Sequence, residues 1–293
     1  MVVATGFFDG VHLGHRQVIR QLVEAAAVRG VESTVLTFWP HPRNVLQKEA
    51  RDLRLLTTLQ QKKEILLELG VDHVEVLPFT KDFSTMTVEE YLRETVIGKY
   101  GGTAILLGYD NRIGCDAKDA DHVARIAESM GLEVIRAEMV LSGSGVAVSS
   151  TKIRGRLAEG DVAGAADMLG YRYSLLGVVV AGNRLGRTIG FPTANMQLYE
   201  PLKLIPANGV YFVKVKTLGR ELYGMCNIGC RPTVSEGNAR TIETNIFGFD
   251  EDIYGLDMEI SFVKKIRDEI RFDSLEALQA QLALDRDTCL GLI

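Results

Sequence analysis

Two histidines near the start of the chain bracket a glycine, in the segment TGFFDGVHLGH. An imidazole can donate a hydrogen bond near pH 7 in its neutral or its charged form, which suits phosphate oxygens that gain negative charge as a phosphoanhydride bond breaks. The alternative is that one histidine only packs in a loop and the other only starts a helix. We expect the turn to bind the triphosphate of ATP through Gly6, Phe7, Asp9, His12, Gly14 and His15.

This turn lies between a predicted strand and a predicted helix. Residues 2–4 form a short apolar run, and apolar side chains recur at helical spacing after residue 14. Open α/β sheets bind ligands at the carboxyl ends of their strands, and a helix start offers unpaired N–H groups and the positive end of its dipole to phosphate. The turn has neither the Gly-Lys-Ser/Thr of a P-loop nor a Gly-x-Gly-x-x-Gly pattern.

Hydroxyl and basic residues stand at another predicted helix start, in the segment VAVSSTKIRGRLAEGD. Hydroxyls and a cation at a helix start can bind phosphate, whereas the alternative is an ordinary Ser/Thr N-cap with solvated basic side chains. We expect the phosphate-binding members to be Ser149, Ser150, Thr151 and Arg154.

Two further segments follow predicted strands and could line the same crevice, although either could be only a turn. They are TFWPHPRNVL, which contains His41, and LLGYDNRIG, which contains Asp110, Asn111 and Arg112.

The C-terminal half contains no histidine, because the last of the five is His122. A general base there is therefore expected to be a carboxylate. The segment GVVVAGNRLGRTIGFPTANM forms a glycine-rich basic loop, although such Gly/Pro/Asn clusters usually mean turns. Its hydroxyl and amide oxygens suit Mg²⁺ with bound ATP, since Mg²⁺ prefers oxygen donors and keeps phosphates as its other ligands. The expected ATP-binding residues are Gly182, Arg187, Gly190, Thr193 and Asn195, the last two also binding the metal.

The elements that position these residues change character along the chain. Short apolar runs alternate with helical patterns up to about residue 160, which predicts a mainly parallel sheet with helices on both faces. After residue 171, period-two alternation at 210–215, 242–247 and 258–263 predicts antiparallel β structure, and 274–284 returns to helical spacing. We predict an α/β domain over residues 1–169 and a small antiparallel β-barrel with a closing helix over residues 170–293.

Composition excludes several classes of protein. The 293 residues are 46% apolar and 24% charged with a net charge of −5, so broad nucleic-acid binding is not expected. The four cysteines are too few and too irregularly spaced for a disulfide framework, and no segment is long and apolar enough to span a membrane. We expect a cytoplasmic protein whose partners are small molecules, and the sequence predicts no oligomeric state.

The two halves resemble two known families. The N-terminal turn is similar to the His-x-Gly-His superfamily of nucleotidyltransferases, and Gly-x-x-x-Gly-x-Gly-Phe-Pro-Thr-Ala-Asn is similar to the riboflavin kinase signature. With PANGVYFVKV, CNIGCRPTV and IETNIFGFDEDIYG downstream, nearly the whole chain resembles the bifunctional bacterial riboflavin kinase/FMN adenylyltransferases, with a Rossmann-like first domain. The resemblance also implies a short segment before the first strand in the complete protein.

The resemblance implies two Mg²⁺-dependent reactions. Riboflavin and ATP would give FMN and ADP in the second domain, and FMN and ATP would give FAD and pyrophosphate in the first. Glu243 would be the base that takes the riboflavin proton, and on its strand it should point away from Ile242 and Thr244. Arg267 and Phe272 would contact the flavin of the kinase, and His41 and residues 110–112 would line the flavin and nucleotide pocket of the adenylyltransferase.

Two alternatives remain open. One is a single-activity FMN adenylyltransferase with a flavin-binding, non-catalytic second domain, and the other is a flavin-binding regulator without turnover. The intact Pro-Thr-Ala-Asn motif and Glu243 argue against the first alternative, and the intact His12, His15 and Glu243 argue against the second. The chain departs from the common family form at Asn111 and Asn245, where an aromatic residue and a histidine are usual.

Overall fold

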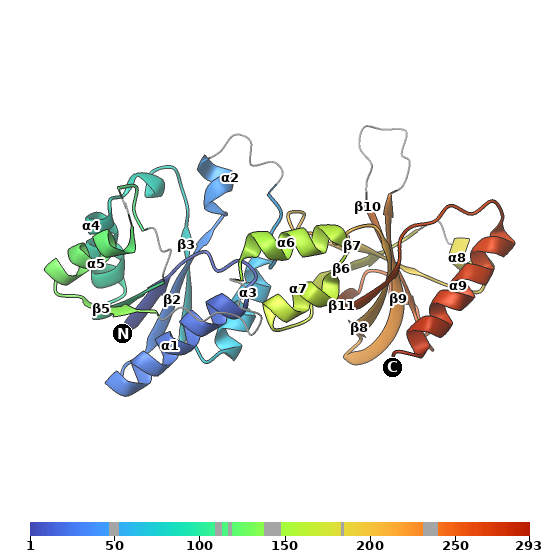
Figure 1. Ribbon diagram of the computed structural model, residues 1–293, viewed down its shortest axis with the longest axis horizontal. Helices are drawn as coiled ribbons and strands as arrows, with labels where there is room; N and C mark the ends of the chain where they lie inside the picture. The colour runs from blue at the N-terminus through green and yellow to red at the C-terminus, as the bar shows by residue number, and fades with distance from the viewer. Residues whose placement is uncertain (47–52, 109–112, 117–118, 138–147, 183–184, 231–239) are drawn as a thin grey trace. The chain divides into compact units, whose positions relative to one another are not determined.

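The computed structural model describes residues 1–46, 53–108, 113–116, 119–137, 148–182, 185–230 and 240–293. Contacts between Cα atoms divide the chain into two units, Met1–Ser150 and Thr151–Ile293 (Figure 1). None of the described helices combines the length and the apolar character that crossing a membrane requires.

The first unit is built on a five-stranded sheet of order β3-β2-β1-β4-β5, in which every neighbouring pair is parallel. Helices α1 and α3 pack on one face, and η3 and α5 pack on the other, which confirms the predicted parallel sheet. The elements are β1 (Val2–Thr5), α1 (Leu13–Arg29), β2 (Ser33–Trp39), α2 (Pro42–Leu46), α3 (Leu59–Glu68), β3 (His73–Pro78), η2 (Phe83–Thr85), α4 (Val88–Glu90), η3 (Tyr91–Lys99), β4 (Ala104–Leu107), α5 (Ala120–Ser129) and β5 (Glu133–Arg136).

The central strand explains why the first residues are continuously apolar. All four residues of β1 are buried, because a central parallel strand is covered on both faces. From β1 the chain moves outward to β2 and β3, and then returns to place β4 on the other side of β1. The carboxyl ends of β1 and β4 therefore border a topological switch point, which is where open α/β sheets bind ligands.

The helical segment between β3 and β4 has an unusual hydrogen-bond pattern. Its first turn, α4, is α-helical, but Tyr91–Lys99 form a π-helix. The buried side chains of this segment are Tyr91, Leu92, Thr95 and Val96. The wider π turn keeps these adjacent pairs on the one face that meets the sheet.

The second unit is a closed barrel of order β10-β7-β6-β11-β8-β9 with antiparallel pairing throughout, which confirms the predicted barrel. Helix α9 packs on the outside of the barrel wall. Helices α6 and α7 fall in this unit as well, and α7 contacts β11. The domain limits 1–169 and 170–293 stay a prediction. The elements are α6 (Ser150–Glu159), α7 (Val162–Leu169), β6 (Ser174–Val180), α8 (Leu185–Thr188), β7 (Ala194–Leu198), β8 (Gly209–Thr217), β9 (Arg220–Cys230), β10 (Arg240–Ile246), β11 (Asp257–Arg267) and α9 (Leu275–Leu290).

The closing helix is longer than predicted. Helix α9 continues to Leu290, six residues beyond the expected end at 284. Leu278, Leu282, Asp285 and Cys289 are spaced by four, three and four residues, so they share one face. The apolar pattern is interrupted at Asp285, which is buried because it is paired with Arg267.

Candidate active sites

The turn after β1 is held in a strained shape by Asp9. Phe8 and Val11 have φ values of 51° and 34°, a region that side chains other than glycine rarely adopt. The buried Asp9 carboxylate accepts hydrogen bonds from the backbone N–H groups of Leu56 (3.0 Å) and Thr57 (3.2 Å), just before α3. Asp9 thus fastens the turn to the start of α3, and this contact fixes the loop that leads into α1.

The two histidines of the turn lie against each other. His12 is the N-cap of α1, and its Nδ1 accepts a hydrogen bond from the backbone N–H of His15 at 3.3 Å. The rings stack with centroids 3.7 Å apart, and a Cβ at Gly14 would lie 3.3 Å from the His12 ring. Because His12 Nδ1 is an acceptor, the proton of the neutral ring is on Nε2, where it can be donated. Glycine between the histidines therefore leaves room for the stacked pair.

His15 is held in its neutral form. Burial lowers the pKa of His15 well below its ordinary value of 6.5, and electrostatic interactions with His12 and Lys62 lower it further. Its Nδ1 is buried and has no hydrogen-bond partner among the residues that the structure describes. A neutral imidazole with one unsatisfied nitrogen can receive or donate a hydrogen bond once a ligand arrives.

Two other predicted residues of this site, Ser150 and His41, contact the turn. The Ser150 hydroxyl donates to the backbone carbonyl of Asp9 at 3.0 Å. The His41 ring lies 4.0 Å from the Phe7 ring, measured between centroids. Ser149 is half-buried next to Ser150, and Thr151 and Arg154 follow on α6. Asp110, Asn111 and Arg112 lie outside the described residues.

In the barrel, Glu243 is placed by strand register. On β10 it is directly opposite Asn195 of β7 and Asn227 of β9, so the three side chains share one face. Its neighbours Ile242 and Thr244 are buried on the other face. Glu243 therefore points out of the barrel interior, as the alternation along its strand predicts.

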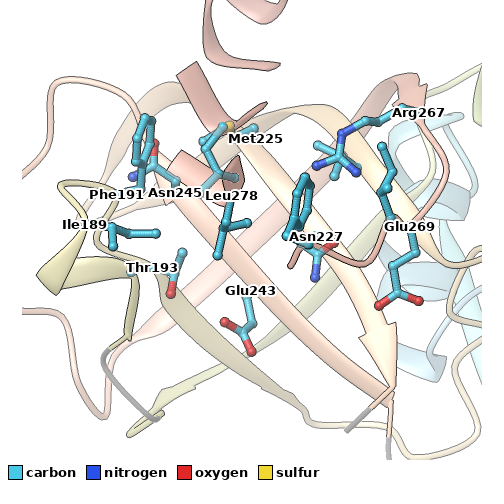
Figure 2. A pocket seen from close by; sticks show the side chains of 15 residues that line it. Ile189, Phe191, Thr193, Met225, Asn227, Glu243, Asn245, Arg267, Glu269 and Leu278 are labelled. Carbon is cyan, nitrogen blue, oxygen red and sulfur yellow. The ribbon is translucent and has the colours of Figure 1, made fainter. Parts of the chain in front are cut away.

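A cavity of about 250 Å³ lies on this outer face of the barrel. Figure 2 shows the Glu243 carboxylate and the Thr193 hydroxyl along the same edge of the cavity. The rest of the lining is mainly apolar and comes from the barrel wall, residues 186–191, residues 267–272 and α9. Its apolar side chains are Ile189, Phe191, Val210, Met225, Ile270, Phe272, Leu278 and Leu282. A site with apolar walls and a carboxylate at its edge suits a flat aromatic ligand that carries a hydroxyl.

A second cavity of about 400 Å³ is more polar, and Thr193 lines both cavities. Arg187, Asp250, Asp252 and Tyr254 contribute to this second lining. Two different ligands can therefore meet at Thr193, one in each cavity.

Glycines keep the loop before β7 tight. A Cβ at Gly182 would lie 2.2 Å from the Asn195 side chain, and one at Gly186 would lie 2.2 Å from the carbonyl oxygen of Phe191. Gly190 has a φ of +79°. The Asn245 side chain donates to the Pro192 carbonyl at 2.7 Å, which fixes the same loop. These contacts position Thr193 and Asn195.

Arg267 enters the apolar cavity from the end of β11. Its guanidinium makes a forked pair with Asp285 of α9, with an Nη2–Oδ2 distance of 2.7 Å and an Nε–Oδ1 distance of 3.0 Å. It also lies 5.8 Å from the centroid of the Phe272 ring. Asp285 was not predicted as a site residue, although its position on the apolar face of α9 indicates a buried carboxylate that needs a partner.

Known proteins match both units. The family model described as FAD synthetase matches residues 1–152, and the one described as riboflavin kinase matches residues 169–292. A bifunctional riboflavin kinase/FMN adenylyltransferase from Listeria monocytogenes is 38% identical over 286 residues, which cover 97% of this chain and 90% of that protein. Its counterpart from Escherichia coli K12 is 36% identical, with 98% and 91% covered. The chain belongs to the bifunctional riboflavin kinase/FMN adenylyltransferase family.

A solved structure agrees over the whole length. The crystal structure of a protein called macrolide-efflux protein from Streptococcus pneumoniae has a TM-score of 0.91 and 33% identity, and the match covers 98% of this chain and 93% of that chain. That structure therefore shares the fold of this chain.

Within the riboflavin kinase half, the oxygen donors beside Glu243 fit a magnesium ion. Thr193 offers a hydroxyl and Asn195 an amide oxygen, and Mg²⁺ typically takes one or two protein oxygens and completes its shell with phosphate and water. In the described part of the chain, no three His, Cys, Asp or Glu side chains gather into a metal site.

In the FMN adenylyltransferase half, Lys62 is a buried residue near the turn that was not predicted as part of the site. Only 1% of this residue is exposed, although it is a lysine on a helix. The available signal was its position, because Lys62 shares a face of α3 with the buried Leu66, one turn away.

Proposed function

We propose that the protein converts riboflavin to FMN in the barrel and FMN to FAD at the turn after β1, with ATP consumed in each step. The observation that carries the kinase assignment is that Glu243 and Thr193 line the same apolar cavity, while Thr193 also lines the second, more polar cavity. The family membership and the paired His12 and His15 support the second step.

In the first reaction, Glu243 takes the proton from the terminal hydroxyl of riboflavin. The freed oxygen attacks the γ-phosphorus of ATP, the bond to the β,γ-bridging oxygen breaks, and ADP leaves. The apolar cavity holds the flavin ring, with Arg267 and Phe272 at one end. Thr193, Asn195 and the phosphates of ATP would hold Mg²⁺, which would supply positive charge to the phosphate oxygens.

In the second reaction, a phosphate oxygen of FMN attacks the α-phosphorus of ATP and pyrophosphate leaves. His12 and His15 donate hydrogen bonds to oxygens whose negative charge increases in the transition state. The start of α1 and the Ser150 segment bind the remaining phosphates, and His41 and residues 110–112 line the pocket for FMN. No covalent enzyme intermediate is needed, since positioning and charge stabilisation suffice.

We assign the two activities to residues 1–169 and 170–293, and we place the protein in the cytoplasm. Cys115, Cys226, Cys230 and Cys289 are all free, as expected in a reducing compartment. The net charge of −5 favours small-molecule partners, namely riboflavin, FMN and ATP, over nucleic acid.

One assay tests the proposal. Riboflavin, ATP and Mg²⁺ are supplied, and FMN and FAD are separated by chromatography over time. FMN should appear first and FAD afterwards, with ADP and pyrophosphate as by-products. Absence of both flavin products would refute the proposal, and FAD formed only from supplied FMN would favour the single-activity alternative.

A further inference from the structure

Lys62 is a buried cation beneath the turn that follows β1. A capping box between Thr58 and Gln61 begins α3, so Lys62 projects from the first helical turn toward the sheet. Its Nζ donates to the Thr37 hydroxyl at 3.2 Å and lies 3.6 Å from the centroid of the Phe7 ring. Phe7 is itself part of the turn, and its carbonyl accepts a hydrogen bond from Thr37.

This environment leaves the ammonium poorly satisfied. A charged lysine has three N–H donors, yet Thr37 supplies the one hydrogen-bond acceptor found for it among the described residues. Burial lowers the pKa of Lys62 to about 8, and the negative charge of Asp9 only partly offsets this effect. The other titratable group in its field is His15, whose pKa Lys62 helps to lower.

A polyphosphate is the ligand that would satisfy this arrangement. Lys62, which can carry positive charge, and the neutral His15, which has an unsatisfied ring nitrogen, lie at a turn at a helix start, whose unpaired N–H groups also favour an anion. Asp9 is occupied in fastening the turn to residues 56–57. An anion at the turn would therefore favour the protonated form of Lys62.

We propose that Lys62 is a positioning residue of the FAD-forming site, a buried cation that becomes fully charged when the phosphates of ATP occupy the turn and that attracts them from beneath the Phe7 ring. This inference rests on the proposed function, because it needs ATP at this turn. Linkage makes it measurable: a cation whose pKa rises on binding takes up a proton from solution.

The test is calorimetric titration of the full-length protein with Mg-ATP in two buffers of different ionisation enthalpy. At about pH 8 roughly half of the Lys62 side chains are uncharged, so the wild type should take up about half a proton more per chain than Lys62→Met. At about pH 6.5 the difference should vanish, because Lys62 is then already charged. Lys62→Arg should lose the proton uptake, since arginine stays charged, and should keep most of the affinity.

Kinetics supply an independent readout. Lys62→Met should raise the KM for ATP in FAD formation about tenfold, which corresponds to about one unit of pKa change on binding. FMN formation from riboflavin in the same chain should be unchanged, because that reaction is assigned to the other unit. The neighbouring Lys63→Met is the matched control and should behave as wild type in both assays.

Several results would overturn the inference. If the wild type makes FAD but Lys62→Met keeps its KM for ATP and its proton uptake, then Lys62 is only structural. If Lys62→Met does not fold, the proton uptake of the wild type is compared with that of Lys62→Arg instead. Equal proton uptake by these two proteins near pH 8 would exclude the protonation of Lys62 on ATP binding. A wild type that makes no FAD refutes the proposed function instead.

Discussion

At the residue scale, the first prediction concerns the Glu243 carboxylate, which lines the apolar cavity of the barrel. Glu243→Gln keeps the size of the side chain but cannot accept a proton from riboflavin. We expect FMN formation to fall by about 10²–10⁴, the usual contribution of a general base. FAD formation from supplied FMN should be unchanged, as measured by chromatography of the flavins.

The exposed Glu221 on β9 offers a control for this experiment. Glu221→Gln should leave both activities at the wild-type level. A Glu243→Gln variant with full kinase activity would remove Glu243 as the base.

The second prediction at this scale concerns pH. Because folding lowers the pKa of His15, the unfolded chain takes up a proton at a higher pH than the folded chain does. The contribution of neutral His15 to the free energy of unfolding is complete at pH values above the ordinary pKa of 6.5, and it is lost as the pH falls below that value. Denaturant titrations between about pH 7.5 and pH 5.5 should show a steeper loss of the free energy of unfolding in the wild type than in His15→Gln. Parallel curves would contradict the burial of a neutral His15.

At the element scale, a single ion pair joins α9 to β11. Asp285 is 2% exposed and Arg267 16%, so Asp285→Asn leaves a largely buried guanidinium without its counter-ion. We expect a loss of about 3–5 kcal/mol in the stability of the barrel, which is typical when one partner of a buried pair is removed. The KM for riboflavin should rise as well, since Arg267 lines the apolar cavity.

Asp287→Asn is the matched control for this pair. Asp287 is two residues away on α9, and its ion pair with Arg286 is exposed. Thermal denaturation and riboflavin kinetics of Asp287→Asn should match the wild type. An equal effect of the two substitutions would show that the Arg267–Asp285 pair has no special role in binding the flavin.

At the scale of the whole molecule, the proposed sites use different residues in different units. His15→Ala alone should stop at FMN, with FAD formation reduced by about 10² or more, and Glu243→Gln alone should not proceed beyond riboflavin. A mixture of the two variants should make FAD from riboflavin after a lag, because FMN released by one chain can be used by the other. A mixture that accumulates FMN without FAD would indicate that FMN must pass within one chain.

The fold class and the local motifs could be predicted from the sequence alone. Alternation of apolar runs with helical spacing predicts the parallel sheet, and the period-two segments predict the barrel. The pair His12 and His15 is contained in four consecutive residues, so a strand followed by a helix is enough to bring the rings together. Signals of this kind depend on neighbours in the chain, and for that reason they can be read from the sequence.

Which residues far apart in the sequence lie next to one another could be seen only in the tertiary structure. The register of β10 with β7 and β9 places Glu243 opposite Asn195 and Asn227, and no local pattern specifies that register. The burial of Lys62 and Asp285 also runs against their residue types, since charged side chains are buried only where partners from other elements compensate them. Such compensation depends on the packing of the whole unit and cannot be read from a local motif. At these two positions the structure therefore adds residues to the sites that the sequence motifs predict.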